Sequence, residues 1–96
     1  MMNTTTAAAK IGLYIQNAAD LLGYDGLSCT ELDGGKVRVD FFTGAYTDGR
    51  AGHHVGAVHV TATVAPDGAV AVYARGVYSG HVHTGATLGD FGIFLG

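Results

Sequence analysis

The strongest constraint on the fold is that residues 27–57 and 59–86 look like two copies of one unit. Each copy contains a short run of polar and apolar residues, a glycine turn, a β-branched run and then a Gly-Tyr loop that ends in histidines. Val37 and Val70, for example, occupy matching places in the two copies. A repeat of this length is one supersecondary unit that cannot bury its apolar side alone. Because the unit is a β-hairpin plus a loop, the pair predicts a four-stranded antiparallel sheet.

A helix is predicted ahead of the repeat, over about residues 6–22. Its end fits Gly23, which is a typical residue just past a helix C-terminus, and Gly12 inside it indicates close packing at that point. Apolar residues recur at alternating spacings of three and four, which places them on one side of the helix: Ala8, Ile11, Ile15, Ala18 and Leu22. We expect this side to lie on one face of the sheet.

The second hairpin is predicted to turn at Pro66-Asp67-Gly68, because proline presets φ and glycine accepts the left-handed conformation. Pairing around this turn sets residues 58–64 against residues 70–76. One face of the hairpin is then apolar. The other face carries His59, Thr61 and Thr63 beside Arg75, Tyr73 and Ala71.

The first hairpin and the remaining segments are less regular. Gly34-Gly35 fits a two-residue hairpin loop, which would place Leu32 opposite Val37. Residues 43–56 are rich in loop-forming residues and predict a long mobile loop. Residues 87–95 are apolar and spaced by glycines, which predicts either a fifth strand at the sheet edge or an arm that packs on a partner chain.

These elements together predict an α+β fold. An N-terminal helix would pack on a four- to five-stranded antiparallel sheet built from two repeated β-hairpins, with residues 1–96 forming a single domain.

Charged residues make up 14% of the chain, against about 25% in typical soluble domains. Because so few charges are available to cover the outside, we expect some apolar surface to meet another chain, in a homodimer or with a protein partner.

Charge and cysteine content exclude several other classes. The net charge is −3 and the five Lys and Arg residues are scattered, whereas nucleic-acid binding needs clustered positive charge. No apolar run approaches the roughly 20 residues of a membrane-spanning helix, and no signal peptide is visible at the start. The single cysteine fits a reducing compartment. We therefore expect a cytoplasmic protein that binds neither nucleic acid nor membranes.

Candidate binding residues lie on the polar face of the second hairpin and in the two Gly-Tyr loops. Tyrosine and arginine are favoured at the centres of protein interfaces, so that face is a candidate recognition surface, although the solvated side of a sheet would have the same composition. In the first loop, an arginine beside histidines suggests a site for an anion or a polar ligand. The candidate binding residues are Tyr46, Arg50, His59, Tyr73, Arg75 and Tyr78.

A metal site is the alternative role for the histidines. His81 and His83 are two residues apart, so they would point to the same side of a strand. If the strand from Val70 continued past Gly80, they would join His59 on the polar face. Three neutral imidazoles can bind Zn²⁺. Zinc is the one cofactor that the sequence suggests, and without such a site we expect none.

No catalytic arrangement stands out. Cys29 is a lone cysteine in a predicted strand, and Glu31 and Asp40 are explained by exposed charges, with Glu31 facing Arg38. We therefore expect a small non-enzymatic binding protein of the inhibitor or adaptor type, acting through a protein surface. The chain length is compatible with a phage or mobile-element accessory protein, although no residue indicates one. The alternative is a small-ligand or metal-binding protein, enzymes included, that uses the His, Arg and Tyr loops.

Overall fold

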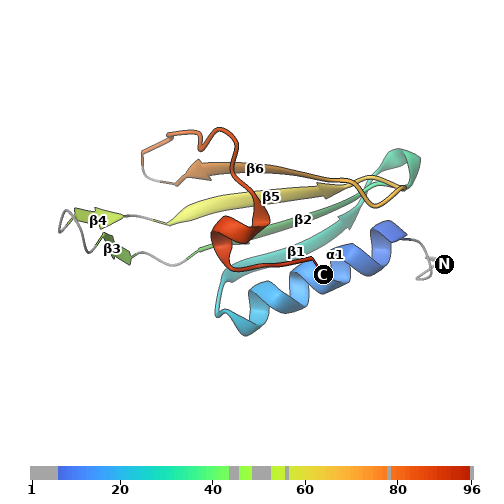
Figure 1. Cartoon of the computed structure of the whole chain (residues 1–96), viewed down its shortest axis with the longest axis horizontal. Coiled ribbons are helices and arrows are strands. Elements are labelled where there is room, and N and C mark those ends of the chain that lie inside the picture. Colours follow the sequence, from blue (N-terminus) through green and yellow to red (C-terminus); the bar gives the residue numbers. More distant parts are fainter. Residues whose placement is uncertain (1–6, 44–45, 49–52, 56, 78, 96) are drawn as a thin grey trace.

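A helix and a four-stranded antiparallel sheet make up the body of the protein. The computed structural model describes residues 7–43, 46–48, 53–55, 57–77 and 79–95. The strand order is β1-β2-β5-β6, with α1 lying along one face (Figure 1). The predicted α+β fold is therefore confirmed with four strands in this sheet. The elements are α1 (Ala7–Leu21), β1 (Asp25–Glu31), β2 (Val37–Phe42), β5 (Val58–Val64) and β6 (Val70–Gly76).

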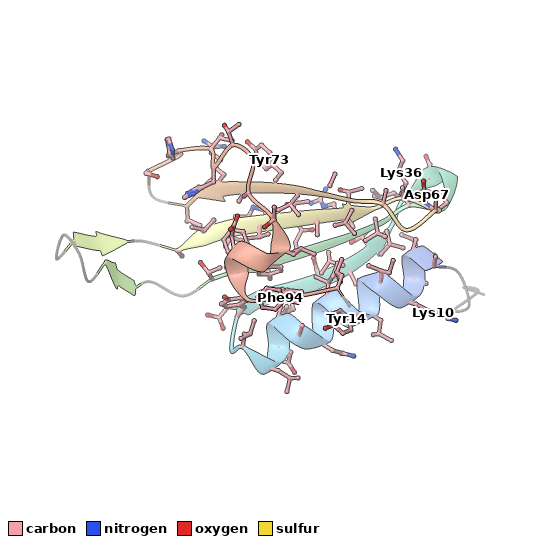
Figure 2. The ribbon with its side chains drawn as sticks, viewed as in Figure 1. Lys10, Tyr14, Lys36, Asp67, Tyr73 and Phe94 are labelled. Carbon is pink, nitrogen blue, oxygen red and sulfur yellow. The ribbon has the colours of Figure 1, made fainter. Side chains whose placement is uncertain are left out.

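The sheet consists of two hairpins whose registers repeat at a constant interval along the chain. Glu31 pairs with Val37 at the closed end of the first hairpin, and Val64 pairs with Val70 at the closed end of the second. Val64 therefore follows Glu31 by the same number of residues as Val70 follows Val37. The register predicted for β5 against β6 is confirmed along both strands. The two loops lie at the same end of the sheet, where Figure 2 labels Lys36 and Asp67.

The first hairpin turns differently from the prediction. The Leu32 N–H donates to the Lys36 carbonyl at 2.8 Å, so residues 32–36 form the loop, with a single 3-10 turn, η1 (Asp33–Gly35), inside it. The expected pair of Leu32 with Val37 is wrong by one residue. Both glycines adopt positive φ, but they do so within a five-residue loop and not as a two-residue turn.

The core lies between α1 and the inner face of the sheet. Fully buried side chains include Ile15 from the helix, Phe41 from β2 and Val60 from β5. Gly12 faces β2 so closely that an added Cβ would lie 2.7 Å from Val37 Cγ1. The close packing expected at this glycine is confirmed, and it brings the helix axis near the strand.

The C-terminal segment does not add a fifth strand. It forms a short 3-10 helix, η2 (Leu88–Phe91), and then turns at Gly92, which has a φ of 82°. Leu88 and Ile93 are buried in the core of the same chain, on the face that α1 also covers (Figure 1). The expectation of a strand is wrong because residues 88–91 form a 3-10 helix and the chain then turns at Gly92.

Two tyrosines anchor this segment. The Tyr24 hydroxyl donates to the Phe91 carbonyl at 2.8 Å, and the Tyr14 hydroxyl donates to the Phe94 carbonyl at 2.6 Å. Figure 2 shows Tyr14 and Phe94 next to each other beside α1. Side chains from the N-terminal part of the chain therefore hold the C-terminal segment in place.

The segment between β2 and β5 contains more structure than the predicted loop. β3 (Tyr46–Asp48) and β4 (His53–Val55) pair antiparallel in a separate two-stranded sheet. This ribbon projects beyond one end of the main sheet (Figure 1). In the part of the chain that the structure describes, no helix is long and apolar enough to cross a membrane.

Candidate functional site

The sheet has one covered face and one open face. α1 and the C-terminal segment pack on the covered face, and no helix in the described ranges lies over the other. Side chains on the open face form three rows across the strands. From β1 to β6 the rows are Thr30-Arg38-Thr63-Ala71, Ser28-Asp40-Thr61-Tyr73 and, beginning at β2, Phe42-His59-Arg75. We refer to these eleven residues as the open face.

A buried carboxylate lies at the centre of the open face. Asp40 is only 6% exposed. Its Oδ2 accepts a hydrogen bond from Arg38 Nε at 2.8 Å, and its Oδ1 accepts one from the Thr61 hydroxyl at 2.7 Å. His59 Nε2 lies 3.1 Å from Oδ1 and must act as the donor, because an ionised carboxylate only accepts. Ser28 Oγ approaches Oδ2 at 3.5 Å.

The surroundings of Asp40 favour its ionised form. Burial on its own raises the pKa of a carboxyl group, because it penalises the charge. Here the hydrogen bonds from Arg38 and Thr61, the positive charge of Arg38 and the hydrogen bond from His59 outweigh that effect and lower the pKa of Asp40 below its ordinary value. Asp40 is therefore an ordered, charged acceptor, and its hydrogen-bond partners come from three different strands.

Aromatic and cationic side chains surround this centre. The rings of Phe42 and His59 stack with centroids 4.5 Å apart. On β6, Tyr73 is 53% exposed and lies beside Thr61, while Arg75 is exposed and lies beside His59. The structure therefore brings Tyr73, Arg75 and His59 onto one face, as the sequence predicts.

The residues at the centre of this face are not among the predicted site residues. The sequence pattern predicts an exposed Asp40 and a pair of Glu31 with Arg38. Both statements are wrong: Asp40 is buried, and Glu31 pairs with Val37 on the covered side. A signal was present in the alternation of Arg38 and Asp40 with apolar residues along β2. Their partners on β5 become visible only once the register of β2 against β5 is known.

Three of the predicted binding residues belong to the two Gly-Tyr loops. Tyr46 lies on β3, outside the main sheet. Arg50 and Tyr78 lie outside the described residues.

The three histidines of the predicted zinc site are not brought together. β6 ends at Gly76 and the chain turns back on itself, so that Val82 forms a bridge with Arg75. His81 and His83 thereby stay close to each other, with ring centroids 5.4 Å apart, while His59 contacts Asp40 on the open face. Among the described residues, no group of three or more His, Cys, Asp or Glu side chains could hold a metal ion.

His81 and His83 instead line a pocket of about 820 Å³ near the C-terminal segment. Its walls combine aromatic rings, hydroxyls, imidazoles and one carboxylate. Lining residues include Tyr24, Thr43, His81, His83, Asp90 and Phe91. This pocket is the second candidate site, and it shares no lining residue with the open face.

Comparison of the chain with protein-family models, curated proteins and solved structures finds no match. The open face and the pocket are therefore judged by their geometry and chemistry alone.

Proposed function

We propose that this chain is a non-enzymatic binding protein that captures an acidic surface of a protein partner on its open face. The observation that carries the proposal is the Asp40 centre, a buried carboxylate held by side chains from three strands on a face that no described helix covers. Because these side chains are already ordered, binding there would cost little further side-chain entropy. The protein would act by occupying its partner, as an inhibitor or adaptor does.

The charge of the open face favours an acidic partner. Arg38 and Arg75 contribute two positive charges and Asp40 contributes one negative charge, so the face is net positive although the chain carries −3. Arg38 is paired with Asp40, whereas Arg75 has no ion pair among the described residues. Complementary charge steers association and selects partners. Tyr73 and Arg75 also belong to the residue types that dominate interface energies.

Two features support binding over catalysis. Both oxygens of Asp40 are occupied by donors, which leaves this carboxylate poorly placed to take a proton from a substrate. Burial, followed by the negative charge of Glu31, raises the pKa of Cys29, so its thiol is protonated at neutral pH and is a poor nucleophile. This thiol is free, which fits the reducing cytoplasm, where we place the protein.

The test first locates the partner and then measures the contribution of the face. A photo-crosslinking residue replaces Ala71, which is exposed on β6, and a second variant carries it at Asn17, which is exposed on α1. In an extract of the cells that express the protein, the partner should crosslink from position 71 and not from position 17. Crosslinking only from position 17 would move the site to the helix.

The affinity of the purified partner then decides the role of Arg75. Arg75→Glu should raise the Kd at least about tenfold, which corresponds to about 1.4 kcal/mol, with an unchanged circular dichroism spectrum. Lys36→Glu makes the same change of charge in the loop between β1 and β2, where Lys36 is exposed, and should leave the Kd unchanged. Equal Kd values for both variants and the parent protein would reject the open face as the binding surface.

The pocket supports an alternative function, the binding of a small ligand. Its volume of about 820 Å³ lies in the range of small-molecule sites, which are about 300–1,000 Å³, and the paired imidazoles of His81 and His83 give it polar contacts. A native mass spectrum of protein purified without chelator distinguishes the two functions. An added mass of a small molecule or a metal would favour the pocket, and its loss in His83→Ala would assign the ligand to it.

A further inference from the structure

The two edges of the four-stranded sheet are protected to different degrees. At β6 the returning chain occupies part of the edge, because Val82 forms a bridge with Arg75 and the His83 N–H donates to the Ala74 carbonyl at 2.9 Å. At the other edge, β1 pairs only with β2 in the described part of the chain, and six of its seven residues are exposed. Its outer backbone groups form a template for another strand.

β1 lacks the side chains that usually protect a sheet edge. Natural edges are guarded by lysine, proline, bulges or short length. This strand has neither lysine nor proline, and its one irregularity lies between Asp25 and Ser28. The regular part, Ser28–Glu31, presents three small uncharged residues before its single carboxylate. An extended segment can therefore pair with this part of β1, where the first charged side chain is Glu31 at the end of the strand.

We propose that β1 pairs antiparallel with β1 of a second copy of this chain, with Cys29 of one copy opposite Cys29 of the other. This arrangement continues the sheet across a two-fold axis, which is the commonest symmetry of homodimers. The occupant of the edge is then a strand of known sequence, and its register can be derived from the side chains.

Charge disfavours a register centred on Ser28 and is compatible with one centred on Cys29. A register centred on Ser28 would place Asp25 opposite Glu31, and like charges directly opposite each other are destabilising. With Cys29 at the centre, Ser28 lies opposite Thr30 and Leu27 lies opposite Glu31. Hydroxyl pairs across strands are favourable, and no two like charges within β1 face each other.

The helix side of the edge carries an apolar groove that a second copy would cover. The groove has a volume of about 340 Å³ and lies between α1 and β1. Leu13, which is 56% exposed, and Cys29 both line it. Lys10 and Glu31, which also line it, make its fixed charges sum to zero. Two such grooves can therefore meet at the axis without repulsion, whereas two net-positive open faces could not.

The dimer would have eight strands in one continuous sheet. Both α1 helices would lie on one side and both open faces on the other, because residues directly opposite each other across an antiparallel pair point to the same side. If the open face binds a partner as proposed above, the dimer would present two such faces in parallel and would gain avidity for a partner with repeated acidic surfaces.

The oligomeric state of the chain in solution tests the dimer directly. Native mass spectrometry and light scattering under reducing conditions should show a dimer. Cys29→Lys places two ammonium groups opposite each other on the axis and should raise the dimer dissociation constant about tenfold or more. Ala71→Lys adds the same charge at an exposed position on β6 and should leave the dimer intact. A parent protein that is monomeric up to about 100 µM would overturn the proposal, as would a Cys29→Lys variant that dimerises normally.

Disulfide trapping tests the register independently. Directly opposed residues in an antiparallel pair have Cα atoms about 4.5–5.5 Å apart, which fits the roughly 4.4–6.8 Å span of a disulfide. Diamide, which accepts the two electrons and two protons released by two thiols, should link two chains through Cys29, the only cysteine. The parent dimer should crosslink much faster than the same protein diluted to monomer. A stable dimer that does not crosslink would place the interface elsewhere, and binding through the open face would remain a separate question.

Discussion

The two hairpins of the sheet share one backbone but carry different open-face side chains. Matching positions of the two copies have matching strand partners and lie on the same side of the sheet. On the covered side the matching residues are mostly apolar, as in the pairs Val37 and Val70 or Val39 and Val72. On the open side, Asp40 in the first hairpin matches Tyr73 in the second, and Arg38 matches Ala71. The shared positions form the core, and the divergent positions form the candidate site.

The divergence also explains where the site lies. Asp40 and Arg38 come from β2, in the first hairpin, whereas His59 and Thr61 come from β5, in the second. Neither hairpin alone contains the whole network. The Asp40 centre therefore forms only when the hairpins pair through β2 and β5, which makes the site a product of the junction between the copies.

The covered side differs between the copies at Phe41, and changing this residue should have the largest effect. Phe41 is fully buried and stacks on Tyr24 with ring centroids 5.3 Å apart, while the matching residue in β6 is only Ala74. Phe41→Ala would make the two hairpins alike here and leave a cavity. We expect the free energy of unfolding to fall by about 3–5 kcal/mol, as measured by urea denaturation.

The control for this change is Phe94→Ala. Phe94 is 68% exposed, so its removal should cost no more than about 1 kcal/mol. If the two variants lost equal stability, the aromatic packing around Phe41 would not be the feature that sets the first hairpin apart from the second.

Local signals in the sequence were sufficient for part of this architecture. The Pro66-Asp67-Gly68 turn defines the register of the second hairpin, because its φ requirements act within a few residues. Gly34-Gly35 satisfied the same kind of rule but indicated the wrong loop length. The spacing of the repeat, taken from Val37 and Val70 and applied to the second register, would have predicted the observed pair of Glu31 with Val37.

The remaining errors concern contacts between segments far apart in the chain. The burial of Asp40 depends on the pairing of β2 with β5, across an intervening segment that contains β3 and β4. The positions of His81 and His83 depend on the turn at Gly80, which has a φ of 70°, followed by pairing along β6. No periodicity within a single strand predicts either arrangement.

A second change removes the carboxylate of Asp40, which has no counterpart at the matching position of the second hairpin, Tyr73. Asp40→Ala leaves the donors of Arg38, His59 and Thr61 without their acceptor, so we expect a loss of about 1–3 kcal/mol at pH 7. The contribution depends on pH, since the pKa of Asp40 is lowered in the folded state. It is complete above the unfolded pKa of about 3.9 and is lost as the pH falls from there through the folded pKa.

Urea denaturation of both proteins at a series of pH values checks this dependence. The gap between parent and Asp40→Ala should narrow below about pH 4, while Asp20→Ala, which removes an exposed carboxylate on α1, should stay within about 0.5 kcal/mol of the parent. A gap that stays constant down to pH 3 would mean that Asp40 stabilises the sheet by packing and not by its charge.

The smallest effect is expected in the loops, where the copies differ in backbone. Gly34 has a φ of 79°, yet the matching residue of the second loop is Asp67, and no described residue other than glycine has positive φ. Nothing lies within 4 Å of a Cβ added at Gly34, so Gly34→Ala tests conformation alone. We expect a loss of about 1–2 kcal/mol in urea denaturation, against about 0.5 kcal/mol or less for Asp33→Ala in the same loop. If both variants cost the same, the first loop can adopt the backbone of the second, and the two copies would differ in side chains only.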